Sequence, residues 1–245
     1  MDHLLSLASI LATATSLLAN QAVPVTYTHG STGYDVSFPQ CGGGYPAGAF
    51  GIVGVNGGYP FVHYNPCLAD EVAHSPHAAL YINTGYDPLY TQVDGQHTMP
   101  ECLTTSAIVK GLPDQKAAWA AGCSEALRSM AYAASQGVAR PSGWWLDVET
   151  ENSWSSTDLS LNQFTIQGIV DTLHRATSVV GIYSTGYQWH TIVGNLPVTG
   201  VRANWVATGS LAAEGAHAHC GTGFSGAPVW LVQYIQGGFD ANYAC

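Results

Sequence analysis

The chain has 245 residues, of which only 6 are Lys or Arg and 16 are Asp or Glu, so its formal net charge is −10. A chain of this length holds one large domain or two small ones, and no internal stretch has the composition of a linker, so we expect one domain. The scarcity of basic residues leaves no positive stripe for a phosphate backbone, which argues against nucleic acid as a partner. Low charge combined with 11% aromatic residues favours a neutral ligand.

The first residues, MDHLLSLASILATATSLLA, form an apolar stretch with a small-residue end. This length and ending are typical of a secretory signal rather than a membrane-spanning helix, although the start lacks basic residues. We expect a signal peptide over residues 1–22, cleaved near Ala19 to Ala22, a leader over 23–32 and the folded domain over 33–245. No later segment is apolar enough to span a bilayer, so we expect a secreted protein without stable membrane insertion.

Six cysteines are scattered singly along the chain, and none forms a CxxC pair. An even set of this kind suits disulfides in an oxidising compartment, and buried thiols are the alternative. The sequence does not fix the pairing, so we take neighbours along the chain as a working hypothesis. The pairs are then Cys41 with Cys67, Cys102 with Cys123, and Cys220 with Cys245.

Short runs rich in Val, Ile, Tyr and Trp have the length and composition of buried strands. They are GYDVSF (33–38), FGIVGV (50–55), AALYIN (78–83), GWWLDVE (143–149), VVGIYS (179–184), ANWVAT (203–208) and VWLVQYI (229–235). Between them, residues 114–137 and 160–176 carry apolar positions at helical spacing. This alternation predicts a parallel α/β fold, a (β/α) TIM-like barrel that is irregular through short or missing helices and stabilised by disulfides.

The run GWWLDVE places two carboxylates among large apolar side chains. Asp147 and Glu149 share one face of a strand, at the carboxyl end where barrel enzymes build their sites. Two close carboxyls cannot both ionise cheaply, so we expect one pKa to rise and supply a general acid. The alternative is a strand end whose acids meet solvent or cap the next turn.

Two further acids lie at the ends of the predicted barrel. Asp35 is in the first predicted strand, and Asp240 comes just past the last one. In a closed barrel the first and last strands are neighbours, so we expect these two carboxylates to lie close together.

Five motifs in order resemble the family 25 glycoside hydrolases, the lysozyme-like muramidases. GYDVSFPQ is similar to their opening G-hydrophobic-D-V-S-x-x-Q strand, and WWLDVE to their D-x-E strand. GIYSTGYQW, ANWVA and VQYIQGGFDANYA are similar to three later strands, the last with its Q-Y pair followed by Asp and Asn. The resemblance runs from about residue 33 to the C-terminus.

The resemblance implies a β/α barrel that cleaves the bond between N-acetylmuramic acid and N-acetylglucosamine in peptidoglycan. It implies Glu149 as general acid, Asp147 as the partner that orients substrate or stabilises developing charge, and Asp35 and Asp240 as supporting acids. Inversion, an enzyme nucleophile and substrate assistance all remain compatible with the sequence. No cofactor is expected.

The turns after the second and third strands depart from the family pattern. GVNGGYPFVHYNPCLADE stands where the family has a K-A-T-E-G type turn, and YINTGYDP replaces G-x-Y-H-[FY]. Both turns lie on the expected binding rim. Two alternatives therefore stay open: a glycosidase for a different polysaccharide, and a non-catalytic carbohydrate-binding module of the cell surface on the same barrel.

Aromatic and amide side chains on the later strands are candidates for substrate binding, since aromatic faces suit a pyranose. The candidates are Tyr81, Tyr183, Trp189, Trp205, Gln233, Tyr234 and Asn242. We expect most of the aromatic residues in the core and one or two in the cleft. Gln233 and Tyr234 match the Q-Y pair of the family, whereas Asn242 has the alternative of capping a turn.

Two patterns that suggest other chemistry are set aside. HAHC (217–220) lacks an H-E-x-x-H partner, and Cys220 is assigned to a disulfide, so no metal site is predicted. GTGFSG (221–226) fits G-x-G-x-x-G but precedes a strand, the reverse of a dinucleotide turn. We therefore expect a monomer whose partner is a polysaccharide or peptidoglycan.

Overall fold

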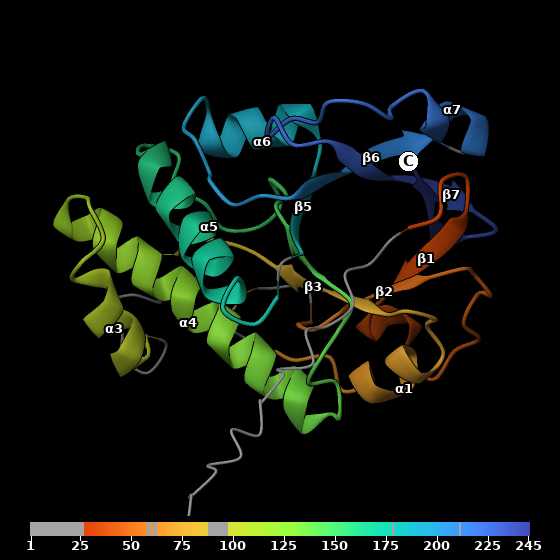
Figure 1. The fold of residues 1–245 in the computed structure, drawn as a ribbon, viewed down its shortest axis with the longest axis horizontal. Helices are drawn as coiled ribbons and strands as arrows, with labels where there is room; N and C mark the ends of the chain where they lie inside the picture. Colours follow the sequence, from red (N-terminus) through yellow and green to blue (C-terminus); the bar gives the residue numbers. More distant parts are fainter. Residues whose placement is uncertain (1–26, 58–59, 61–62, 88–97, 178, 211) are drawn as a thin grey trace, which may run out of the picture.

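The computed structural model describes residues 27–57, 60, 63–87, 98–177, 179–210 and 212–245. Eight strands close into a barrel in chain order (Figure 1). They are β1 (Thr32–Val36), β2 (Gly51–Gly54), β3 (Ala79–Asn83), β4 (Trp144–Asp147), β5 (Val180–Ser184), β6 (Ala203–Ser210), β7 (Val229–Gln236) and β8 (Phe239–Ala244). Strands β1 to β7 pair in parallel and coincide with the predicted runs, so the barrel prediction is confirmed.

The last strand corrects the expectation of an all-parallel sheet. β8 is antiparallel to both β7 and β1 and closes the barrel between them. It follows β7 through Gly237 and Gly238, which both have positive φ (61° and 85°), the conformation that a two-residue hairpin turn requires. Asp240 and Asn242 therefore lie in a strand, and the alternative that Asn242 caps a turn is wrong.

Two long helices cover one side of the barrel (Figure 1). They are α4 (Pro113–Ser135) and α5 (Leu159–Leu173), which confirm the predicted helices at 114–137 and 160–176. The other helical segments are short and lacked a clear periodic signal. They are η1 (Phe38–Gln40), α1 (Leu68–Ala73), α3 (Pro100–Ser106), α6 (Gly186–Val193) and α7 (Ala213–His217). Among the residues described, no helix is long and apolar enough to cross a membrane.

Two glycines let α4 and α5 approach closely. A Cβ atom at Gly122 of α4 would overlap the backbone oxygen of Thr165, and a Cβ atom at Gly168 of α5 would overlap that of Trp119. The two helix backbones are therefore in contact, and a side chain at either glycine would collide with the backbone of the other helix.

We expect Gly122→Ala to lower the free energy of unfolding by about 1–3 kcal/mol, because overlap with packed backbone outweighs the better helix propensity of alanine. Urea unfolding would show this loss of stability as a lower urea concentration at the midpoint of the transition. Gly44→Ala is the matched control, because a Cβ atom there meets no atom within 4 Å. Equal midpoints for the two variants would contradict the close approach.

Two layers of apolar side chains lie on either side of the sheet. The inner layer fills the barrel and includes Trp145 and Trp205, while the outer layer, between strands and helices, includes Leu146 and Ile166. Tyr27, from the predicted leader, joins the inner layer: its ring lies 4.7 Å from that of Phe50 and its hydroxyl accepts a hydrogen bond of 3.2 Å from Trp145 Nε1. The predicted signal peptide lies outside the described residues.

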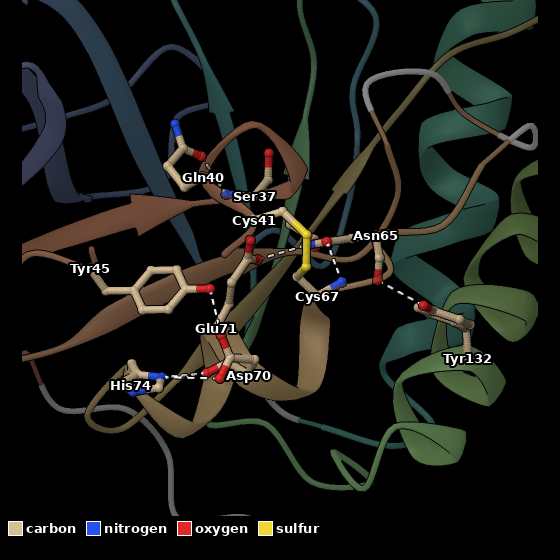
Figure 2. Close-up of a disulfide and its surroundings, with 11 residues drawn as sticks. Ser37, Gln40, Cys41, Tyr45, Asn65, Cys67, Asp70, Glu71, His74 and Tyr132 are labelled. Carbon is tan, nitrogen blue, oxygen red and sulfur yellow. Dashed lines mark hydrogen bonds and ion pairs between the residues drawn. A yellow bond between two sulfur atoms is a disulfide. The ribbon is translucent and has the colours of Figure 1, made fainter. Parts of the chain in front are cut away.

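The cysteines form three disulfides, Cys41–Cys67, Cys102–Cys123 and Cys220–Cys245, as hypothesised from their order. The alternative of buried thiols is wrong. The first disulfide joins the segment after β1 to the start of α1 (Figure 2). Beside it, Asn65 Nδ2 donates to Gly54 O (2.8 Å) and to Glu71 Oε2 (2.6 Å), so the ends of β1 and β2 are tied together.

Candidate active site

The paired carboxyls lie where β4 ends. Asp147 is the last residue of the strand, and Glu149 follows two residues later. Trp145 lies inside the barrel while Leu146 and Val148 pack against the helices, so alternation directs both carboxyls to the inner side. Asp147 is 7% exposed, Glu149 is half-buried, and the two side chains hydrogen-bond to each other.

Burial raises the pKa of both carboxyls. For Asp147, burial is the largest cause, and the charges of Glu149 and Asp35 add to it, so its pKa lies well above the ordinary range. Burial also raises the pKa of Glu149, while a hydrogen bond from Gln188 lowers it. Asp147 Oδ1 has no hydrogen-bond partner among the residues described, which makes the ionised form costly. The pair therefore favours one shared proton.

The second pair of acids faces the first from β1 and β8. Asp35 and Asp240 are direct cross-strand partners in the β1–β8 ladder, which places them together as expected. Burial, followed by the charge of Asp240, raises the pKa of Asp35 to about 7, although hydrogen bonds from two amides oppose the shift. Asp240 is exposed, and burial of its carboxyl still raises its pKa.

The Asp35 carboxylate is held by two amides whose orientation is fixed by aromatic donors. Asn242 Nδ2 donates to Asp35 Oδ2 (2.7 Å), and Gln233 Nε2 donates to both Asp35 oxygens (3.1 and 3.2 Å). Trp205 Nε1 donates to Asn242 Oδ1 (2.6 Å), and the Tyr183 hydroxyl donates to Gln233 Oε1 (2.8 Å). Since an indole N–H can only donate, Asn242 must turn its amino group toward Asp35.

The tyrosine hydroxyls of Tyr81 and Tyr183 lie among the four acids. The pKa of Tyr81 is raised by burial and then by the charges of Asp35 and Asp147. The pKa of Tyr183 is raised by burial and then by the charges of all four carboxyls, beginning with Glu149. Both tyrosines therefore stay neutral, and the single hydroxyl proton of Tyr183 is already donated to Gln233 Oε1.

Three aromatic candidates are corrected. Tyr234 follows Gln233 directly on β7, so it points to the opposite face and packs in an outer cluster. Trp189 is 6% exposed and packs on Phe224, with ring centroids 5.4 Å apart, in the layer of α6. Trp205 is 2% exposed in the barrel interior, where it orients Asn242 rather than presenting a face to a ligand.

One group near Glu149 was missed by the sequence reasoning. Gln188 stands in the first turn of α6, where Thr185 caps the helix by accepting from Gln188 N. Its Oε1 accepts from Thr150 N (2.5 Å) and Thr150 Oγ1 (3.1 Å). The Thr185 cap was a readable signal for the start of α6, but the contact across the site was not.

The departing turns on the rim form a network of asparagines. Asn56, after β2, exchanges two hydrogen bonds with the backbone of Asn83, at 2.7 and 2.9 Å. Asn152 Nδ2 donates to Asn83 Oδ1 (3.0 Å), which links this rim to the segment after β4. Within the described part of the chain, no group of three or more His, Cys, Asp or Glu is arranged to hold a metal ion.

The molecule is thus a closed β/α barrel with four acids gathered where its strands end. A family model described as "Lys-1: Lysozyme-like protein 1" matches residues 116–209, a stretch that includes Asp147 and Glu149. No curated protein sequence matches the chain.

Solved structures share the fold at low sequence identity. One is the modular autolysin LytC from Streptococcus pneumoniae in complex with a synthetic peptidoglycan ligand, with a TM-score of 0.53, 13% identity, and coverage of 89% of this chain and 47% of that chain. Another is the wild-type modular Cpl-1 endolysin complexed with a peptidoglycan analogue, with a TM-score of 0.51, 16% identity, and coverage of 89% and 55%. The chain spans about half the length of these proteins.

Proposed function

We propose that the protein is a secreted glycoside hydrolase that cleaves a cell-wall glycan, with Glu149 as the general acid. The observation that carries the proposal is the pair of Asp147 and Glu149 on the inner side at the end of β4, whose pKa values are both raised by burial, opposite the cross-strand pair Asp35 and Asp240. A carboxyl that stays protonated near neutral pH is what a leaving glycosidic oxygen needs.

Each of the acids has a different role in bond cleavage. Glu149 gives its proton to the leaving oxygen as the bond from that oxygen to the anomeric carbon breaks, and a water supplies the hydroxyl that replaces it. Asp147 shares the proton with Glu149, and the Asp35 carboxylate, set by its two amides, stabilises positive charge that develops on the sugar ring. The water's remaining proton returns to the carboxyl pair.

The proposed substrate is peptidoglycan, at the bond between N-acetylmuramic acid and N-acetylglucosamine. Support comes from the motif resemblance to the family 25 muramidases, from the lysozyme-like family model and from two fold neighbours whose structures contain a synthetic peptidoglycan ligand and a peptidoglycan analogue. Three disulfides suit export through an oxidising compartment, in line with the signal peptide expected over residues 1–22.

A carbohydrate-binding module without turnover is the second candidate. The asparagine network on the rim favours it, because these turns differ from the family pattern. The two candidates differ in the products that they predict.

The test is release of new reducing ends from purified peptidoglycan, and from a panel of other wall polysaccharides, with mass spectrometry of the products. We expect fragments that end in reducing N-acetylmuramic acid. Fragments that end in reducing N-acetylglucosamine would show that the other glycosidic bond of peptidoglycan is cleaved. Cleavage of another polysaccharide but not of peptidoglycan would show that the substrate is a different glycan. Binding to peptidoglycan with no cleavage of any polysaccharide would favour the module.

A further inference from the structure

An open groove lies on the outer side of the barrel, between the segment that follows η1 and the helix α1. Its volume is about 480 Å³, and it is lined by residues 42–47 together with Asp70 and His74. None of the four acids at the strand ends belongs to this lining. We call it the flank groove, and it is a separate site from the candidate active site.

Three side chains of the flank groove are fixed against one another (Figure 2). The Tyr45 hydroxyl donates to Asp70 Oδ2 at 2.7 Å, and His74 Nδ1 lies 2.8 Å from the backbone oxygen of Asp70. The rings of Tyr45 and His74 have centroids 4.9 Å apart and planes 33° apart. Because a backbone oxygen can only accept, Nδ1 of His74 carries a hydrogen and donates it.

The polar side-chain atoms that remain open to a ligand are acceptors. The only proton of the Tyr45 hydroxyl is given to Asp70, so its oxygen has lone pairs to offer. Asp70 Oδ1 lies 3.6 Å from His74 Nδ1, beyond hydrogen-bond distance, and a carboxylate only accepts. In neutral His74 the second ring nitrogen accepts as well. The described lining residues include no Lys or Arg, so the groove suits a ligand that donates and is positively charged.

We propose that the flank groove binds an amino sugar through its protonated amine. An ammonium group has three donors and no acceptor, which matches Asp70 Oδ1 and the Tyr45 oxygen. The Tyr45 ring and Pro46 supply an apolar surface for the sugar ring, and a net charge of −10 attracts cations. A Cβ atom at Gly42 or Gly44 would meet no atom within 4 Å, so the space in front of this segment is open.

The inference goes beyond the proposed function, because binding in the flank groove requires no hydrolysis. Only the origin of the sugar, a cell-wall polymer, rests on that function. An N-acetylated sugar lacks the positive charge and one of the donors, so it should bind the groove more weakly than the free amine.

The test is an NMR titration of the nitrogen-15-labelled Glu149→Gln protein, in which the oligosaccharides should stay intact. The two probes are a glucosamine tetramer and an N-acetylglucosamine tetramer. We expect the glucosamine tetramer to shift the backbone amides of residues 42–44, with a Kd about tenfold lower than that of the acetylated tetramer. Amide signals identify the groove even when a probe also binds at the four acids.

Three variants in the same background test the contacts. Asp70→Asn should raise the Kd of the glucosamine tetramer in the groove about tenfold, and Tyr45→Phe, which keeps the ring, about threefold. Gly44→Lys leaves both of these side chains in place and adds a cation where a side chain meets open space, so it should also weaken binding about tenfold. Asp114→Asn, at an exposed position in the first turn of α4, is the control and should bind normally.

The outcomes that would overturn the proposal are distinct. Unchanged binding in both Asp70→Asn and Gly44→Lys, or amide shifts confined to the candidate active site, would refute the groove as a site. Equal binding of the two tetramers there would refute recognition of the amine. Tighter binding of an alanyl-lysine dipeptide than of the glucosamine tetramer would refute the sugar as the source of the amine.

The two proposals fail separately. Cleavage of peptidoglycan by the wild type, without binding of the glucosamine tetramer in the flank groove, would refute this inference and keep the hydrolase. Binding in the groove by a protein that cleaves no glycan would refute the hydrolase and keep the amine site.

Discussion

Glu149→Gln should lower kcat for glycan hydrolysis by about 10²- to 10⁴-fold, the share that a positioned general acid contributes. Glutamine has nearly the shape of glutamic acid and retains a group for Gln188 to contact, but it cannot give up a proton to a leaving oxygen. Binding of the glycan should persist, since the loss falls on the transition state. Initial rates of reducing-end release, together with pull-down on insoluble peptidoglycan, measure the two effects separately.

Glu151→Gln is the matched control. Glu151 is an exposed acid two residues further along the same segment, and its Oε2 lies 3.3 Å from Thr150 Oγ1. The substitution removes a charge from the same segment. The Glu151 charge raises the pKa values of Asp147 and Glu149 less than burial does, so we expect activity to stay within about threefold of the wild type. An equal loss of activity in both variants would mean that the negative charge of Glu149, rather than its proton, supports hydrolysis. Undiminished hydrolysis by Glu149→Gln would refute the assignment of Glu149 as the general acid.

The barrel and the carboxyl pair could be predicted because both depend on local periodicity. Alternation along GWWLDVE places Trp145, Asp147 and Glu149 on one side, and the structure keeps this arrangement. The same rule should have separated Gln233 from Tyr234, since neighbours on a strand face opposite sides. The sequence analysis placed both residues in the cleft because the Q-Y pair matches the family. In the structure only Gln233 contacts the acids, and Tyr234 packs on the opposite face.

Other parts of the site depend on contacts between residues distant in sequence. Asn242 and Asp35 are 207 positions apart, and Gln188 and Thr150 are 38 apart. No local pattern reports which side chains meet across a closed barrel. The strand β8 was missed for a different reason: Gly237–Gly238 is a two-residue hairpin signal, but the polar run that follows has little of the β-branched character expected of a strand.

Folding stability should be greatest at acidic pH and should fall as the pH rises from about 4 to 7. The pKa of Asp35 is raised from its ordinary value to about 7, and burial also raises the pKa values of Asp147, Glu149 and Glu71. Between the unfolded and folded pKa values the native state binds more protons than the unfolded chain, so stability decreases with pH. Each such proton lowers the free energy of unfolding by about 1.4 kcal/mol per pH unit.

Thermal unfolding followed from pH 3 to 8 (about one point per pH unit) measures this slope. In Asp35→Asn the group at that position no longer titrates, so the fall in stability over this range should be shallower than in the wild type, whatever the absolute stability of the variant. Glu101→Gln, at an exposed position in the first turn of α3, should keep the wild-type slope.

The sign of the slope bears on the chemistry of the site. When a carboxyl that favours its protonated form in the native state ionises, the protein loses folding stability. The same free-energy cost of ionisation keeps a proton available near neutral pH. If stability falls less steeply with pH in Asp35→Asn than in the wild type, ionisation of the Asp35 carboxyl, which Asn242 and Gln233 hold, accounts for part of the loss. Stability that instead rises from acidic to neutral pH would mean that the native site favours ionised acids, and a proton shared by Asp147 and Glu149 could not then be kept for a leaving group.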